Sequence, residues 1–135
     1  MYRKFASLSL VLAVLALTGC KKDAEINAVL ADFDSFTKEL VKKVEAQPNA
    51  AGVDDAQKFL DSKKSEMTAK WDSIKGARGF QVSEDTQKKM EESLKNNFMS
   101  VAGLQMKYMS KSMSDPAFKT KLEKLVKDYQ ALYQT

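Results

Sequence analysis

Four stretches of the chain place apolar residues three or four positions apart, with polar and charged residues between them. This spacing follows the 3.6-residue turn of an α-helix and puts the apolar side chains of each stretch on one face. We therefore expect amphipathic helices at about residues 23–47, 53–75, 83–112 and 115–134. No window sustains the two-residue alternation that is typical of a half-buried strand. The sequence predicts an all-α fold.

The apolar residues that share these helical faces form the predicted core. In the first two helices they are Ile26, Val29, Leu30, Phe33, Phe36, Leu40, Val41, Val44, Val53, Ala56, Phe59, Leu60, Met67, Trp71 and Ile74. In the last two helices they are Met90, Leu94, Phe98, Val101, Leu104, Tyr108, Phe118, Leu122, Leu125, Val126, Tyr129, Leu132 and Tyr133. The pattern is weakest in the second helix, where it thins at Lys63 and Lys64.

Residues that favour helix ends agree with these boundaries. Ser83 and Asp115 are suited to accept hydrogen bonds from the first free N–H groups of the third and fourth helices. Pro116 fits the first helical position, where its missing N–H costs nothing. Asp54 and Asp55 are expected in the first turn of the second helix, near the positive end of the helix dipole.

The connections between the predicted helices are short, which favours antiparallel neighbours and an up-down-up-down bundle. Pro48, Asn49 and Gly52 are expected to separate the first two helices. Gly103, in the middle of the third helix, predicts a close helix crossing or a slight bend. An elongated pair of hairpins is the alternative, because the third helix is longer than the others.

The N-terminal residues have the organisation of a secretory signal. Arg3 and Lys4 supply positive charge, and an apolar run of 13 residues follows at 5–17. The run is shorter than the roughly 20 residues that a membrane-spanning helix needs. Small residues then follow it, as a cleavage site requires. We expect a cleaved signal peptide.

Leu17-Thr18-Gly19-Cys20 resembles the lipobox of bacterial lipoproteins, in which a leucine and two small residues precede a cysteine. The resemblance implies cleavage between Gly19 and Cys20, a diacylglyceryl thioether on Cys20 and acylation of its new amino group. It divides the chain into a signal peptide at 1–19, a membrane-proximal segment at 20–22 and a helical domain at 23–135. The alternative is a secreted protein with an incidental cysteine.

Membrane lipid is thus the first expected partner, through Cys20. Each buried CH₂ of an acyl chain contributes about 0.8 kcal/mol, so two or three chains hold a protein almost permanently. Lys21 and Lys22 would lie at the lipid headgroups. Lysine after the cysteine resembles the signal that sends lipoproteins to the outer membrane rather than the inner membrane. We expect a lipid-anchored protein of the bacterial cell envelope.

Composition argues against several classes of function. Without residues 1–19 the chain has 116 residues, the length of one domain, and its net charge falls from +4 to +2. A nearly neutral, charge-mixed surface argues against nucleic acid as a partner. The chain has no histidine, which removes the commonest general base and metal ligand. Adjacent carboxylates on a helix point about 100° apart and do not share a proton. We predict no catalysis, no metal site and no cofactor beyond the lipid.

Methionine is the most distinctive residue of the third predicted helix. Met99, Met106, Met109 and Met113 lie within about 80° of arc, beside the apolar face of that helix rather than on it. Three interpretations remain open: adaptable filler in the core, a contact surface for a partner helix or small apolar ligand, and a soft-metal site for Cu(I). We expect an envelope protein that acts by protein binding or structural contact. The alternative is a binder of a small apolar ligand or Cu(I).

Overall fold

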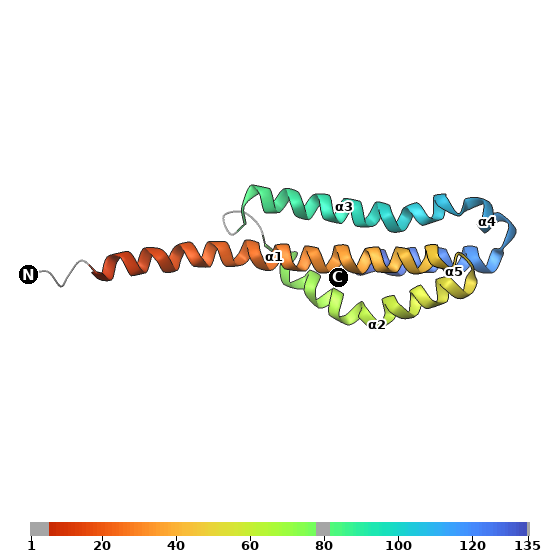
Figure 1. Ribbon diagram of the computed structural model, residues 1–135, viewed down its shortest axis with the longest axis horizontal. Helices are drawn as coiled ribbons and strands as arrows, with labels where there is room; N and C mark the ends of the chain where they lie inside the picture. The colour runs from red at the N-terminus through yellow and green to blue at the C-terminus, as the bar shows by residue number, and fades with distance from the viewer. Residues whose placement is uncertain (1–5, 78–81, 135) are drawn as a thin grey trace, which may run out of the picture.

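The computed structural model describes residues 6–77 and 82–134, and the side chains of residues 23–77 and 82–134. Within those ranges the chain forms helices and no strand (Figure 1), which confirms the all-α prediction. The helices are α1 (Ala6–Ala46), α2 (Ala50–Ile74), α3 (Glu84–Lys107), α4 (Met109–Ser114) and α5 (Pro116–Ala131).

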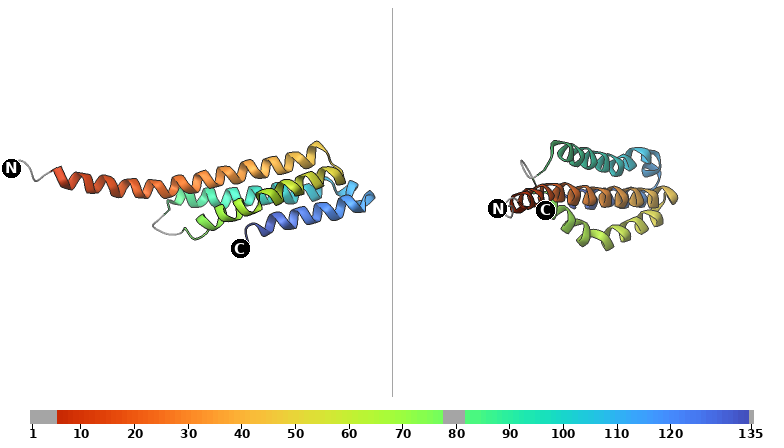
Figure 2. Two further views of the ribbon diagram at one scale, coloured as in Figure 1. Left: turned by 90° about the horizontal axis from the view of Figure 1, so that it is seen from below. Right: turned by 60° about the vertical axis from the view of Figure 1, so that its left-hand side comes forward.

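The four long helices pack around a shared core. α2 returns antiparallel along α1, and α3 begins at the end of the bundle where α2 finishes (Figures 1 and 2). α3 makes its main helix contacts with α1 and α5, whereas α5 packs on both α2 and α3. α2 and α3 are therefore not close packing neighbours. The short connection between them in the sequence had favoured direct antiparallel packing.

The core contains the residues that the helical spacing predicts. Its larger cluster draws Phe33, Leu40, Leu60, Val101 and Tyr129 from the four long helices, together with residues around them. A smaller cluster of Ile26, Leu30, Ile74 and Val82 lies at the end of the bundle where α2 finishes. Nine predicted core residues are only partly buried: Val29, Val41, Phe59, Trp71, Met90, Leu94, Phe98, Tyr108 and Tyr133.

Two of the predicted helix caps are present. The Thr86 N–H donates to Ser83 Oγ at 3.3 Å, and the Phe118 N–H donates to Asp115 Oδ1 at 3.1 Å. Pro116 occupies the first turn of α5, as predicted. These features are local in sequence, and the residues that form them are recognisable without tertiary information.

The start of α2 differs from the prediction. Asn49 caps the helix by accepting a hydrogen bond from the Gly52 N–H at 2.9 Å, so α2 begins at Ala50 rather than near residue 53. Gly52 lies inside the helix, and the first turn contains no acidic residue. The placement of Asp54 and Asp55 in that turn was therefore wrong, and Asp54 forms an ion pair with Lys121 of α5.

The predicted third helix is divided in two. α3 ends at Lys107, and Tyr108 leaves helical geometry with φ −107° and ψ 24° before α4 begins. The Tyr108 ring packs edge-on against Phe118 at a centroid distance of 5.9 Å, which fixes the chain where it turns toward α5. Gly103 does not mark a close crossing, because a methyl group added there would meet no atom within 4 Å.

α1 begins at Ala6 and continues without interruption through the predicted cleavage site, so residue 23 is not a helix boundary. The structure describes no side chain before Asp23. The predicted lipobox, Leu17-Thr18-Gly19-Cys20, and the two lysines after it therefore lie outside the described side chains. In the part of the chain that the structure describes, no helix is both long enough and apolar enough to cross a membrane.

Candidate functional site

The four methionines predicted as a contact or ligand surface lie on the outside of the bundle. Met99 is 62% exposed, Met106 76%, Met109 55% and Met113 82%. Among the described side chains they are the exposed large apolar residues. We refer to these four residues as the Met surface. Their exposure rules out the interpretation that they fill the core of this chain.

Two helices carry the Met surface. Met99 and Met106 belong to α3, whereas Met109 and Met113 belong to α4, beyond the break at Tyr108. The break is held by backbone hydrogen bonds on both sides: the Tyr108 N–H donates to the Leu104 carbonyl at 3.0 Å, and the Ser112 N–H donates to the Tyr108 carbonyl at 2.9 Å. α4 has no buried residue and is held against α5 at one side.

Two lysines flank the Met surface, and each interacts with a side chain of a neighbouring helix. Lys107 Nζ lies 2.7 Å from Glu45 Oε1 at the end of α1, and this hydrogen bond raises the pKa of Lys107. Lys111 Nζ lies 5.7 Å above the ring of Phe118. The Met surface therefore has basic side chains beside it on both α3 and α4.

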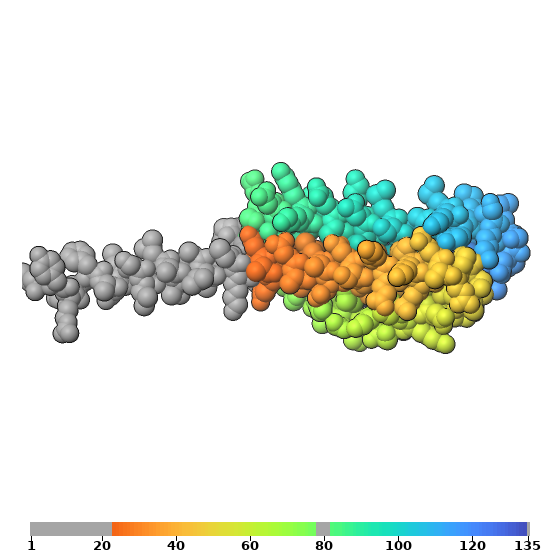
Figure 3. All heavy atoms as spheres, viewed as in Figure 1, coloured from red at the N-terminus to blue at the C-terminus, as the bar shows by residue number. Residues whose placement is uncertain are grey.

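The Met surface lies far from the N-terminal end of the bundle. The contact between Lys107 and Glu45 places the end of α3 beside the end of α1. Asp23, where the described side chains begin, lies about 33 Å from Glu45 along the same helix, at 1.5 Å per residue. Figure 3 shows the segment around α4 at the tip opposite the start of the described part of α1.

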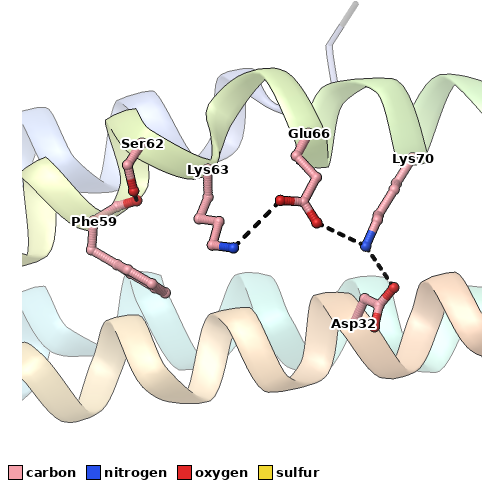
Figure 4. Close-up of polar contacts among 6 residues, drawn as sticks. All are labelled: Asp32, Phe59, Ser62, Lys63, Glu66 and Lys70. Carbon is pink, nitrogen blue, oxygen red and sulfur yellow. Dashed lines mark hydrogen bonds and ion pairs between the residues drawn. The ribbon is translucent and has the colours of Figure 1, made fainter.

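A cluster of charged side chains lies between α1 and α2 (Figure 4). Lys70 Nζ binds Asp32 Oδ2 at 2.7 Å and Glu66 Oε1 at 3.0 Å, and Glu66 also pairs with Lys63 at 3.4 Å. The hydrogen bond to Asp32 raises the pKa of Lys70, and the hydrogen bond from Lys70 lowers the pKa of Glu66.

These pKa shifts favour the charged forms of Lys70 and Glu66, so neither of these two groups is poised to exchange a proton near neutral pH. Two of its members, Lys63 and Glu66, belong to the exposed stretch at residues 61–66, where the apolar pattern of α2 is interrupted. The ion pair between Lys70 and Asp32 joins α2 to α1 at the surface, beside the core contact between Trp71 and Phe33.

The sequence did not reveal a buried chain of hydroxyl groups. Thr37 Oγ1 lies 2.6 Å from the hydroxyl of Tyr129, which lies 2.9 Å from the hydroxyl of Tyr133. Burial raises the pKa of both tyrosines, which keeps their hydroxyls neutral. Thr37 follows a core phenylalanine on α1, and no sequence signal paired it with a residue 92 positions away.

In the described ranges, no group of three or more histidine, cysteine, aspartate or glutamate side chains could hold a metal ion. The predicted soft-metal alternative depends instead on the thioethers of the Met surface, which no His or Cys accompanies.

A comparison of the chain with protein-family models, with curated proteins and with solved structures finds no match. Function is therefore inferred from the N-terminal sequence and from the geometry described above.

Proposed function

We propose that this protein is a lipid-anchored helical protein of the bacterial envelope, which acts by binding another envelope protein and not by catalysis. The lipobox-like segment ending at Cys20 supports the anchor. The exposure of the Met surface, at the tip opposite the anchor, is the observation that carries the binding role.

Methionine suits such a role physically. Its side chain is unbranched and polarisable, so a group of exposed methionines can adapt to apolar partners of different shape. Single exposed apolar residues are ordinary on protein surfaces and need no explanation. Four on one short segment, in a domain whose other large apolar side chains are at least partly covered, favour a contact surface.

The proposed anchor would set the position of this surface. Lipid chains on Cys20 would hold the first turns of α1 at the bilayer, with the outer membrane as the expected location. The Met surface would then face away from that bilayer, about 33 Å along α1 from Asp23 if the bundle stands upright. The expected partner is an envelope protein that approaches from the aqueous side, and no nucleic acid is involved.

Site-specific photo-crosslinking in intact cells tests the binding role. A photoreactive residue at Met106 should yield a crosslinked product, and the same residue at the exposed Lys127 of α5 serves as control. The product should disappear when Met109 and Met113 are also replaced by lysine. No product at 106, or the same product from both positions, would contradict the proposal.

An anaerobic titration of the full mature protein with Cu(I) tests the alternative, in which the Met surface binds a soft metal. A ligand that binds only the folded state raises the melting temperature with concentration. Replacing Met106 and Met109 with leucine keeps the surface apolar but removes two thioethers. A rise in melting temperature that is lost in this variant would favour metal binding over protein binding, whereas no rise removes the metal alternative.

A further inference from the structure

A groove of about 620 Å³ opens between the end of α2 and the first half of α3. Its apolar lining comes from Trp71 and Ala77 on one side and from Met90 and Leu94 on the other, and the polar side chains of Lys75, Gln87 and Glu91 complete it. Each of these side chains is partly buried. The volume falls within the range of about 300–1,000 Å³ that is typical of small-molecule sites.

The groove exists because α5 is short. α5 has 16 residues, against 25 in α2 and 24 in α3. α5 therefore ends before it reaches the end of the bundle where α2 finishes and α3 begins (Figures 1 and 2). Tyr133, just after α5, is the last aromatic residue, and its ring packs edge-on against Trp71 with 5.2 Å between the ring centroids. Beyond Trp71 no further part of α5 separates α2 from α3.

The apolar lining of the groove lies directly over core residues. Trp71, Ala77 and Met90 pack against the smaller core cluster, which includes Ile26 of α1 and Ile74 of α2. A ligand in the groove would therefore extend this core and cover its partly exposed edge. Burial of apolar surface contributes about 25 cal/mol per Å², without requiring directional partners from the ligand.

The groove lies at the N-terminal end of the bundle. The Ser83 N–H at the start of α3 donates to Asp23 Oδ1 at 3.1 Å. Asp23 is three residues after Cys20, about 4.5 Å along a helix. If Cys20 carries lipid, as the proposed function holds, the groove opens close to the bilayer surface, where the commonest apolar molecules are hydrocarbon chains.

We propose that this groove binds the hydrocarbon chain of a fatty acid, distinct from the protein's own anchor. The inference rests on the proposed function for its location and on the groove itself for its chemistry. The chain lies along Trp71, Met90 and Leu94, and its polar end remains in solvent. This ligand site is separate from the Met surface, which lies at the opposite tip.

Trp71 is the only tryptophan in the sequence, so tryptophan fluorescence comes from this one residue in the lining of the groove. The mature lipoprotein is reconstituted in phospholipid vesicles and titrated with 9,10-dibromostearic acid, whose bromine atoms quench tryptophan at contact. Unbrominated stearic acid is the control probe. We expect saturable quenching by the brominated chain, reversed by an excess of the unbrominated chain.

Matched variants locate the site. Leu94→Lys and Met90→Lys should each weaken the binding at least about tenfold, because a charged side chain replaces an apolar wall. Ala117→Lys, at an exposed position of α5 near the other tip, should leave the quenching unchanged. Circular dichroism and the melting temperature of each variant establish that it remains folded.

Absence of quenching in the folded, membrane-bound protein would overturn the groove proposal and leave the proposed anchor intact. Release of the wild-type protein from the membrane fraction would instead overturn the anchor. If the protein is a dimer in which Trp71 is shielded, and Leu94→Lys makes it a monomer, the groove is a self-association surface and the lipid proposal fails.

Discussion

The hydroxyl groups of Thr37 and Tyr129 lie 2.6 Å apart and join α1 to α5 across the bundle. Both residues are buried, and these two helices otherwise pack mainly on α2 and α3. Tyr133 extends the contact to a third hydroxyl at 2.9 Å. Because buried hydroxyls are costly when unpaired, this chain of groups favours one relative placement of α1 and α5.

Removal of the Tyr129 hydroxyl should destabilise the fold. Tyr129→Phe keeps the ring in the core but leaves the Thr37 hydroxyl without its partner. We expect the free energy of unfolding to fall by about 1–3 kcal/mol, measured by urea denaturation. Tyr108→Phe, whose ring also packs on an aromatic neighbour, is the control and should lose less. Equal losses in the two variants would show that the hydroxyl contact between Thr37 and Tyr129 stabilises the fold no more than the hydroxyl of Tyr108 does.

Alkaline pH should weaken the fold through the same tyrosines. Burial raises the pKa of Tyr133 and of Tyr129 in the folded state above the ordinary value near 10. A raised pKa contributes stability that is fully present below the unfolded pKa and is lost as the pH rises toward the folded pKa. We expect the free energy of unfolding to fall as the pH rises above about 10.

The Tyr133→Phe variant isolates this effect from the titration of the lysines. Its free energy of unfolding should fall less between pH 8 and pH 11 than that of the wild type. Absorbance at 295 nm follows tyrosinate formation in the same samples. A parallel fall in both proteins, or full ionisation of the tyrosines while the helices remain folded, would contradict the assignment.

Two glycines should respond to alanine with opposite signs. A methyl group at Gly52 would lie 1.7 Å from the Gln47 carbonyl oxygen, so Gly52→Ala should destabilise the protein by at least about 2 kcal/mol. Gly103 has open space around it, so Gly103→Ala should stabilise α3 by about 0.5–1 kcal/mol. Thermal denaturation of the two variants measures both effects, and an undiminished melting temperature for Gly52→Ala would contradict the close approach of Gly52 to Gln47.

The Met surface should tolerate charge. Met106→Lys and Met109→Lys change exposed side chains, so each should alter the free energy of unfolding by no more than about 0.5 kcal/mol. Met67→Lys is the matched control, because Met67 is buried between α1 and α2, and it should destabilise the fold by several kcal/mol. A large loss from Met106→Lys in the isolated protein would mean that this side chain belongs to the core.

Local sequence signals account for much of the fold. The three- and four-residue spacing identifies the buried faces because a helix in a bundle must cover one side. Ser83 and Asp115 identify helix starts because capping depends on residues three positions apart. Asn49 carries the same type of signal, but Gly52 was interpreted as a break, whereas the helix uses it for a close approach to Gln47.

The remaining features depend on contacts between distant segments. No glycine or proline marks the break at Tyr108, which coincides with the packing of its ring on Phe118. The methionines widened the apolar face of the predicted third helix, and their exposure follows from how few helices surround α3 and α4. The groove beside Trp71 depends on where α5 ends relative to α2 and α3, which spacing along one helix does not predict.

The mass of the N-terminal peptide of the protein, purified from the membranes of a bacterial host that processes lipoproteins, tests the central proposal most directly. We expect a peptide that begins at Cys20, lacks residues 1–19 and carries a diacylglyceryl group, with an additional acyl chain where the host adds one. A peptide that retains Met1 and a free thiol at Cys20 would contradict the anchor and every functional role derived from it.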